Sequence, residues 1–231
     1  MSRGRTGLPR LHLVTSDAVL AAPDFVERAT AVLAAHGPGV ALHVRAHGMD
    51  GRPLLRIVRA LAPAGAALLL VNDRVDVALA ADVGAQIGRR SLPVPVARRL
   101  LPRRWLGYSA HAAGEAETAV REGADFVVLG TIFATPSHPG AGGTGVGLVR
   151  AAAPVAPVVA IGGITAERVA LCVAAGAHGV AVLGGVWTAD DPVAATGSYL
   201  QALDAARPAT GGGTDAAGLG EEAGRMDRGR E

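Results

Sequence analysis

Short runs of apolar residues alternate along the chain with longer segments whose apolar residues recur every three or four positions. The short runs are rich in Val, Leu, Ile and Ala, which is typical of strands that are buried on both faces of a parallel sheet. The pattern predicts eight strands: Leu11–Thr15, Val40–Arg45, Ala67–Val71, Ala85–Ile87, Trp105–Ser109, Phe126–Leu129, Val158–Ile161 and Gly179–Leu183.

The segments between these runs have the spacing of amphipathic helices. Helices are expected at Pro23–Ala35, Arg52–Ala62, Val75–Ala81, Pro93–Leu101, Ala112–Glu122, Ala166–Ala175 and Pro192–Ala205. Eight strand–helix units favour a closed (β/α)8 TIM barrel of the α/β class, because closure leaves no strand with an open edge.

Three segments are expected along the 231 residues: an N-terminal arm at 1–9, the barrel at 10–206 and a tail at 207–231. The tail is rich in Gly, Ala, Thr and charged residues and has no periodic apolar face. Such a composition does not bury enough apolar surface to offset the entropy of ordering, so the tail is predicted to be disordered.

The composition excludes several classes of function. The formal net charge of +2 gives no support for a nucleic-acid or membrane surface, and no leader or membrane-spanning run stands out, so we expect a cytoplasmic protein. All 22 basic residues are arginine, which excludes Schiff-base and other lysine chemistry. Cys172 is the single cysteine and lies among apolar residues, where a buried side chain is expected.

Glycine pairs follow the last two predicted strands, at Gly162–Gly163 and Gly184–Gly185. In parallel barrels the loops after these strands often bind phosphate, because glycine lets backbone N–H groups approach the oxygens. Closing a tight turn is the alternative role of either pair. Two pairs at successive strand ends favour a phosphate site.

Polar residues at the carboxyl ends of the other strands are candidates for chemistry, because barrel enzymes gather their site there. They are His43, Arg45 and His47; Asn72, Asp73 and Arg74; Ser109 and His111; and Thr135, Ser137 and His138. No pair of histidines or carboxylates has the spacing of metal ligands, so no metal site is expected. His12 and His178 lie away from the expected site and are interpreted as structural.

These residues resemble the thiamine-phosphate synthase and TenI superfamily over roughly residues 10–206. The resembling segments are Val71-Asn72-Asp73-Arg74, Gly107-Tyr108-Ser109-Ala110-His111, Gly123-Ala124-Asp125-Phe126-Val127, the loop 130–140, Ile161-Gly162-Gly163-Ile164-Thr165 and Gly179-Val180-Ala181-Val182. The resemblance implies a barrel that acts on thiazole phosphates.

The chain departs from the synthase branch, which joins an aminopyrimidine diphosphate to a thiazole phosphate with the help of magnesium and basic side chains. A Gln-x-Arg-Glu-Lys pattern is replaced by His43-Val44-Arg45-Ala46-His47, a Gly-Gln-x-Asp pattern by Gly88-Arg89-Arg90-Ser91, and a lysine by His138. A single carboxylate, Asp73, is a poor magnesium site. Histidine is only partly protonated near neutral pH, so it stabilises a leaving diphosphate less than lysine does.

The departures favour the TenI-like branch, thiazole tautomerases that move a proton without a metal or other cofactor. The resemblance assigns proton transfer to His111, whose side chain suits acid–base work near neutral pH. Arg45 or Asn72 is expected to orient the substrate carboxylate, with Ser109 at the same mouth, and Thr135 and Ser137 to line a covering loop.

Two other functions stay open at this point. One is thiamine-phosphate synthase, which alone would bring in Mg²⁺; the other is a non-catalytic barrel that binds a phosphorylated ligand. A small phosphorylated thiazole is the expected partner in each case, and assembly of identical chains is possible. Whether His43, His47 and His138 contact the substrate is left undecided.

Overall fold

The structure is a computed structural model that describes residues 7–135 and 142–207. Its eight strands are β1 (Leu11–Val14), β2 (Val40–Val44), β3 (Leu68–Asn72), β4 (Gly84–Ile87), β5 (Leu106–Ala110), β6 (Phe126–Gly130), β7 (Val158–Ile161) and β8 (Gly179–Val182). Each strand pairs in parallel with the next, and β1 also pairs with β8. The strands therefore close into a barrel, which confirms the predicted fold.

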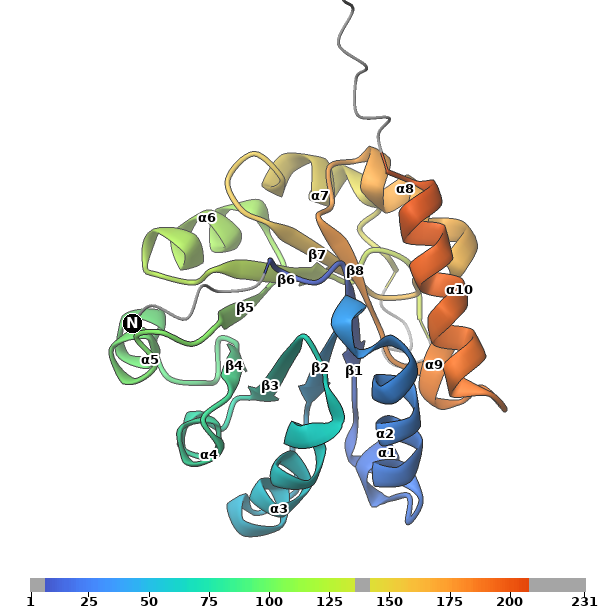
Figure 1. Ribbon diagram of the computed structural model, residues 1–231. Coiled ribbons are helices and arrows are strands. Elements are labelled where there is room, and N and C mark those ends of the chain that lie inside the picture. The colour runs from blue at the N-terminus through green and yellow to red at the C-terminus, as the bar shows by residue number, and fades with distance from the viewer. Residues whose placement is uncertain (1–6, 136–141, 208–231) are drawn as a thin grey trace, which may run out of the picture.

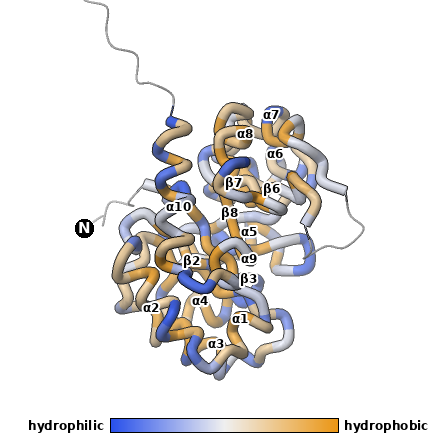
Figure 2. Tube along the Cα trace, turned by 90° about the vertical axis from the view of Figure 1, so that its right-hand side faces the viewer, coloured by the Kyte–Doolittle hydropathy of each residue, from blue (hydrophilic) through white to orange (hydrophobic). Residues whose placement is uncertain are grey.

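Helices surround the strands as an outer ring (Figure 1). They are α1 (Asp17–Ala21), α2 (Phe25–His36), α3 (Gly51–Leu61), α4 (Val75–Ala81), α5 (Val94–Leu100), α6 (Ala113–Arg121), α7 (Val146–Ala152), α8 (Val169–Ala174), α9 (Gly184–Trp187) and α10 (Pro192–Ala205). Short 3₁₀ turns occupy Gly37–Gly39, Ala62–Ala64 and Ala166–Arg168. Hydrophobic and hydrophilic residues alternate along α2 and α10, as expected of helices with one buried face (Figure 2).

The sequence pattern missed α1, α7 and α9. Helix α1 has five residues and is held by the Ser16 side chain, which accepts a hydrogen bond from the Val19 N–H, so it is too short to show a helical period. Helix α9 is four residues long and begins with Gly184 and Gly185, residues of low helix propensity. The predicted helix at 166–175 begins as a 3₁₀ turn, and α8 follows it.

Alternation along the strands divides the core into two layers. Side chains of one parity fill the barrel interior, where Val14, Ala41, Leu70, Phe126 and Val159 pack together. Those of the other parity pack against the helices and form the larger cluster. Residues that alternate with the interior set therefore face the helices, and this parity decides which polar side chains point into the barrel.

Cys172 lies on α8 and is completely buried, as predicted. Burial raises the pKa of its thiol to about 11, so the thiol stays protonated near neutral pH. Within the described ranges, none of the helices has the length and apolar character needed to cross a membrane. The predicted tail and most of the predicted N-terminal arm lie outside the described residues.

Candidate functional site

The candidate residues meet at the carboxyl ends of the strands. Arg45 directly follows β2, Asn72 ends β3, and Ser109 lies near the end of β5. Val44 is in register with Val71, and Asn72 with Gln86, so the ends of β2, β3 and β4 are level. The sheet thus brings the predicted residues of β2 to β5 to one side of the barrel mouth, and the glycine pairs to the other.

The backbone after β2 is held by residues that the sequence analysis did not select. The Thr15 hydroxyl donates to the Arg45 carbonyl at 3.1 Å and accepts from the Arg45 N–H at 2.8 Å. The Asp17 carboxylate accepts hydrogen bonds from the backbone N–H groups of Gly48 and His47, which lower its pKa. Thr15 is a polar residue at the end of the first predicted strand, and this could have identified it from the sequence.

Arg45 itself has a half-buried side chain. Among the described residues, its guanidinium has no hydrogen-bond or ion-pair partner. In contrast, the Arg74 guanidinium forms two hydrogen bonds with Asp76, at 2.9 and 2.6 Å. Arg45 is therefore the cation at these strand ends that is available to an anionic ligand, whereas Arg74 is occupied by its ion pair.

Asp73 follows β3 in the left-handed region, with φ of 62°. Its N–H donates to the Gln86 carbonyl, and its carboxylate accepts a hydrogen bond from the Ser91 hydroxyl. Ser91 also accepts from the Gly88 N–H at 3.3 Å. Ser91 therefore links the loop after β4 to Asp73. In the synthase pattern the position of Ser91 is occupied by a carboxylate.

Asp73 is a carboxylate at these strand ends that could take part in a magnesium site. No group of three or more His, Cys, Asp or Glu side chains in the described parts of the chain is placed to hold a metal ion. Asp73 is engaged by Ser91, Asp17 by backbone N–H groups, and Asp76 by Arg74. Mg²⁺ is bound through one or two carboxylates together with substrate phosphates, so Asp73 with the oxygens of a bound diphosphate would be the groups to hold it.

Asn72 and Ser109 are joined to buried polar groups of the barrel interior. The Gln86 amide nitrogen donates to the Ser109 hydroxyl oxygen at 2.9 Å. Asn72 and Gln86 are 7% and 1% exposed. Their side-chain oxygens, Oδ1 and Oε1, are buried without a hydrogen-bond partner among the described residues. A buried acceptor of this kind is expected to have a partner when a ligand or ordered water is present.

His111 is exposed at the end of β5, as predicted. Its Nδ1 lies 2.6 Å from the Gly130 carbonyl oxygen, and its backbone N–H donates to Glu115 at 2.8 Å. Because a carbonyl only accepts, Nδ1 carries the hydrogen and Nε2 of the neutral ring is a bare acceptor. The ring is thereby fixed in one tautomer beside the end of β6.

Gly162 and Gly163 have φ of 102° and 59°, which favours glycine. A Cβ at either position would overlap the segment 131–134, and the Gly162 carbonyl accepts from the Phe133 N–H at 2.9 Å. Turn closure is therefore one reason for both glycines. Within residues 7–135 and 142–207 their N–H groups have no hydrogen-bond acceptor, so they are also available to an anion.

The two residues of the second glycine pair differ in the room that they leave for a Cβ. A Cβ at Gly185 would overlap the Tyr199 hydroxyl, so packing explains this glycine. A Cβ at Gly184 would meet nothing within 4 Å. Both residues open α9, where backbone N–H groups have no partner within the helix. Gly184 is thus a glycine that packing does not require.

The remaining predicted residues are distributed differently. Thr135 is half-buried in the loop after β6, whereas Ser137 and His138 lie outside the described residues. His47 is exposed. His43 is 1% exposed and faces the barrel interior, so it is not a loop residue that faces solvent. The cause is strand parity, because His43 alternates with Val44 and shares the interior face with Ala41.

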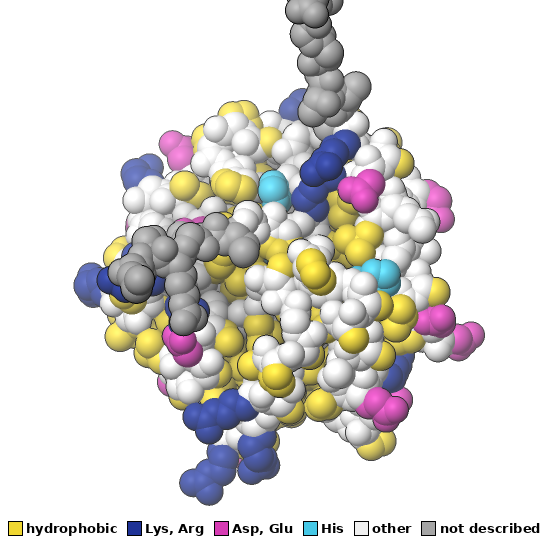
Figure 3. Space-filling model, viewed as in Figure 1, with side chains coloured by type: hydrophobic (Ala, Val, Ile, Leu, Met, Phe, Trp, Pro, Cys, Tyr) yellow, Lys and Arg dark blue, Asp and Glu magenta, His cyan; other side chains and the backbone are white. Residues whose placement is uncertain are grey.

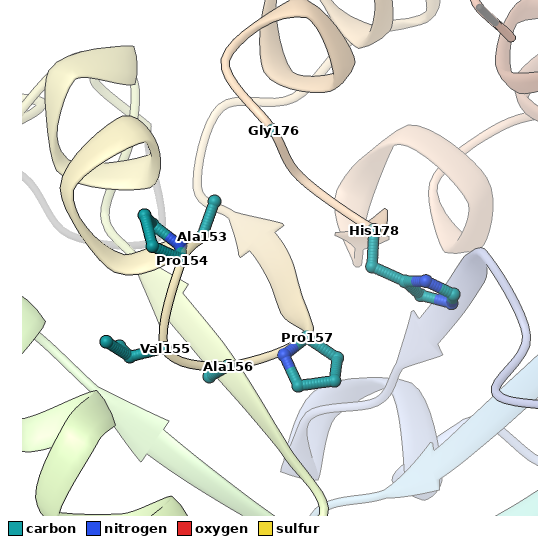
Figure 4. Close-up of a pocket in the computed structure, with 7 residues that line it drawn as sticks. All are labelled: Ala153, Pro154, Val155, Ala156, Pro157, Gly176 and His178. Atoms are coloured by element: carbon teal, nitrogen blue, oxygen red, sulfur yellow. The ribbon is translucent and has the colours of Figure 1, made fainter.

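A hollow of about 540 Å³ lies at the opposite end of the barrel. It is lined by Ala153, Pro154, Val155, Ala156, Pro157, Gly176 and His178, in the segments that lead into β7 and β8 (Figure 4). The His178 ring points away from the prolines, and its Nε2 lies 2.9 Å from the Leu8 carbonyl oxygen. This hollow is apart from the candidate site, because barrel chemistry is located at the carboxyl ends of the strands.

Comparison with known proteins supports one superfamily. The profile of the family TMP-TENI, described as "Thiamine monophosphate synthase", matches residues 11–186. Proteins named thiamine-phosphate synthase from Moorella thermoacetica and Methanoculleus marisnigri are 40% and 42% identical, over 74% and 76% of this chain and 85% and 87% of their own. The one from Chloroflexus aurantiacus is 47% identical over 58% of this chain and 64% of its own length.

Solved structures agree with this result. A thiamine phosphate pyrophosphorylase from Pyrococcus furiosus has a TM-score of 0.73 and 29% identity, covering 85% of this chain and 96% of that chain. A structure titled "Native KDPGal structure" has a TM-score of 0.64 at 19% identity, covering 87% of this chain and 97% of that chain, and shows the shared fold alone.

The relatives correct the functional reading of the sequence. The thiazole tautomerase interpretation is wrong, because the relatives of 40–47% identity are named thiamine-phosphate synthase. The departures at His43, Ser91 and His138 were given too much weight against the similarity of the whole barrel. With a family profile that matches most of the barrel and relatives that cover most of the chain, the protein belongs to the thiamine monophosphate synthase (TMP-TENI) family.

Proposed function

We propose that this protein is a transferase of the thiamine-phosphate synthase type. It would join an aminopyrimidine diphosphate to a thiazole phosphate and release diphosphate. The observation that carries the proposal is the 40–42% identity to proteins of that name over about three quarters of the chain. The available cation, the fixed imidazole and the free N–H groups at one barrel mouth support it.

The reaction makes one bond and breaks one. The thiazole nitrogen donates its electron pair to the methylene carbon of the aminopyrimidine, and the carbon–oxygen bond to the diphosphate breaks with its electron pair leaving on oxygen. Negative charge therefore develops on the leaving group, and a positive group placed there lowers the barrier. Both substrates carry phosphate, so the site also needs two anchors for anions.

We assign the leaving diphosphate to the side of the mouth formed by β2 to β4. The Arg45 guanidinium has no partner there within the described part of the chain, and Arg89 and Arg90 are exposed in the loop after β4. Arginine stays charged at all physiological pH values and binds phosphate oxygens in pairs. If Mg²⁺ binds here, Asp73 and the diphosphate oxygens would hold it, and its charge would stabilise the leaving group.

We assign the thiazole phosphate to the other side of the mouth. The N–H groups of Gly162, Gly163, Gly184 and Gly185 are the proposed phosphate donors. His111, with Nε2 as an acceptor, is proposed to line the site between the two substrates, together with Ser109, Thr135 and Ser137. We do not propose a proton-transfer role for His111 in tautomerisation, because the thiazole tautomerase interpretation is wrong.

A non-catalytic barrel that binds a phosphorylated ligand is the second candidate. The absence of lysine from the sequence, Ala46, and Ser91 in place of a carboxylate favour it. These changes reduce the charge available for diphosphate chemistry and leave the glycine pairs unchanged.

The test uses the purified full chain with both substrates and follows diphosphate release and the coupled product. Release of one diphosphate per product, absent when either substrate is omitted, is the expected result. Thiazole phosphate that binds in calorimetry without any diphosphate release from the complete mixture would overturn the transferase and favour the binding barrel. Reactions with and without Mg²⁺ run in parallel.

A further inference from the structure

Tyr199 lies in the middle of α10, and its side chain is buried. Helix α10 packs against α9 and against the 3₁₀ turn Ala166–Arg168, and Figure 1 shows it beside α8 and α9. These are the elements that follow β7 and β8 along the chain. Tyr199 is thus placed close to the two segments that carry the glycine pairs.

The Tyr199 hydroxyl contacts both of these segments. It donates a hydrogen bond of 3.1 Å to the carbonyl of Ile164, the residue that follows Gly162–Gly163. A Cβ at Gly185 would overlap the same hydroxyl, so the hydroxyl lies against the backbone of α9. Burial raises the pKa of the Tyr199 phenol, which therefore stays protonated and able to donate near neutral pH. One side chain thus links the turn after β7 to α9.

The carbonyl groups of the turn after β7 are all held by the protein. Four successive carbonyls, those of residues 161–164, each accept a hydrogen bond; the donors are the N–H groups of Ile132 and Phe133, the Arg168 guanidinium and the Tyr199 hydroxyl. In a trans peptide the carbonyl and the following N–H point in opposite directions. The N–H groups of residues 162–165 are therefore directed away from these donors, and within the described ranges none of them has a hydrogen-bond acceptor.

A phosphate that is bound by both segments needs a fixed spacing between them. The N–H groups of Gly184 and Gly185 also lack an acceptor among the described residues, and no backbone hydrogen bond in those residues joins α9 to the turn after β7. If the two segments moved independently, each binding event would have to order one against the other, and this cost would reduce the affinity.

We infer that Tyr199 is a positioning residue, whose hydroxyl holds the turn after β7 and α9 at the spacing at which N–H groups of both bind one phosphate. The inference rests on the proposed function, which assigns the phosphate of the thiazole to these N–H groups. Tyr199 does not touch the ligand, because it lies on the carbonyl side of the turn. Its loss should therefore affect the thiazole phosphate and not the aminopyrimidine diphosphate, which is assigned to the other side of the mouth.

The first test is Tyr199→Phe, which keeps the ring and removes the hydroxyl. The Kd for thiazole phosphate, measured by calorimetry on the full chain, is expected to rise about 5- to 10-fold, as for the loss of one hydrogen bond that orients the site. KM for the aminopyrimidine diphosphate should change less than about twofold. An unchanged Kd for thiazole phosphate, in folded Tyr199→Phe, overturns the inference.

Thr196→Val is the matched control on the same helix. The Thr196 hydroxyl is also buried and donates to the Pro192 carbonyl at 2.7 Å, and valine keeps the branched shape of the side chain. The variant loses a buried hydrogen bond that involves neither glycine pair. It should lower the melting temperature, as Tyr199→Phe does, and leave the Kd for thiazole phosphate unchanged. A similar rise in Kd in both variants would trace the effect to a loosened α10 and overturn the inference.

A second test examines the contact between the hydroxyl and α9 without any ligand. Gly185→Ala should lower the melting temperature, because the added Cβ overlaps the Tyr199 hydroxyl. Tyr199→Phe removes that hydroxyl, so Gly185→Ala should lower the melting temperature less in this background. Equal losses in the two backgrounds would mean that the hydroxyl does not hold α9, which contradicts the inference.

Backbone ¹H–¹⁵N spectra of the labelled full chain show whether one phosphate uses both segments. The signals of Gly163 and Gly185 are expected to shift together as thiazole phosphate is added to the wild type, and together at higher concentrations in Tyr199→Phe. A shift of only one of the two signals in the wild type overturns the inference. If the wild type releases no diphosphate from the two substrates, the transferase proposal fails, whereas the calorimetry and the spectra still decide on Tyr199.

Discussion

The two sides of the barrel mouth present different kinds of binding group, side chains on one side and backbone N–H groups on the other. From β2 to β5 the site consists of side chains, with Arg45, Asn72 and Ser109 supported from below by buried polar groups. From β6 to β8 it consists of backbone, where the glycine pairs bring N–H groups to the mouth. A side-chain site changes its chemistry with each substitution, whereas a backbone site changes only when its conformation does.

Among the described residues, the departures from the synthase pattern follow this division, whereas His138 lies outside them. His43, Ala46, His47 and Ser91 all lie on the side-chain half. The glycine pairs of the backbone half are retained, and three of the four are also required by packing or by a positive φ. The proposed phosphate end of the site is therefore constrained by the fold, whereas the side chains of the other end are free to vary.

The largest expected effect is the loss of stability in acid, which tests the side-chain half. Burial lowers the pKa of His43 to about 3, so below about pH 6.5 the unfolded chain binds a proton that the folded chain excludes. Stability is therefore lost as the pH falls from about 6.5 to 3, by about 3 kcal/mol from His43 between pH 7 and 4. Urea unfolding of wild type and His43→Gln at several pH values measures it. The expectation is contradicted if the free energy of unfolding depends on pH in the same way in both proteins.

Gly163→Ala tests the backbone half and should be nearly as costly. The residue has φ of 59°, and a Cβ would overlap Phe133 and the Ala134 carbonyl. The left-handed conformation costs about 1–2 kcal/mol for alanine, and overpacking adds about 1–3 kcal/mol. We expect a loss of about 2–5 kcal/mol in urea unfolding. Gly65→Ala, at φ of 89° with nothing within 4 Å, is the matched control that shows the conformational part alone.

The sequence was sufficient for the barrel because each strand and most helices carry their own local signal. Val75–Ala81, Val158–Ile161 and Pro192–Ala205 were predicted to the residue. Helix α9 was missed because its stability comes from packing, with Val186 and Trp187 buried, and not from the helix propensity of two glycines.

The contact between His12 and His43 could not be predicted, because the two residues are far apart along the chain. Their rings come within 2.7 Å only when β1 and β2 are neighbours in register, with Leu13 opposite Leu42. From the sequence alone His43 could lie either on a strand face or on a loop surface. Closure of the barrel places it in the interior, because it shares the parity of Ala41.

Arg45→Ala should reduce turnover without unfolding the protein. The Arg45 guanidinium has no partner among the described residues, so its removal leaves none of their buried groups without a hydrogen bond. Loss of a charge-assisted contact to a phosphate is expected to lower kcat/KM for the aminopyrimidine diphosphate about 10- to 100-fold. Arg56→Ala is the control, because Arg56 belongs with Arg52 and Arg59 to the exposed face of α3, where basic side chains gather in Figure 3. Equal effects of the two substitutions would remove Arg45 from the site.

The smallest expected effect distinguishes the two reasons for a glycine. At Gly184 a Cβ meets nothing within 4 Å, and the residue opens α9, so Gly184→Ala should change the free energy of unfolding by less than about 0.5 kcal/mol. If a phosphate occupies that open space, the added methyl group keeps the phosphate away from the backbone N–H of residue 184. The Kd for thiazole phosphate should then rise up to about 10-fold in calorimetry. Gly147→Ala, also in open space on α7, is the control for the substitution itself. An unchanged Kd would mean that the phosphate does not use the space beside Gly184, and it would leave Gly162 and Gly163 as the proposed donors.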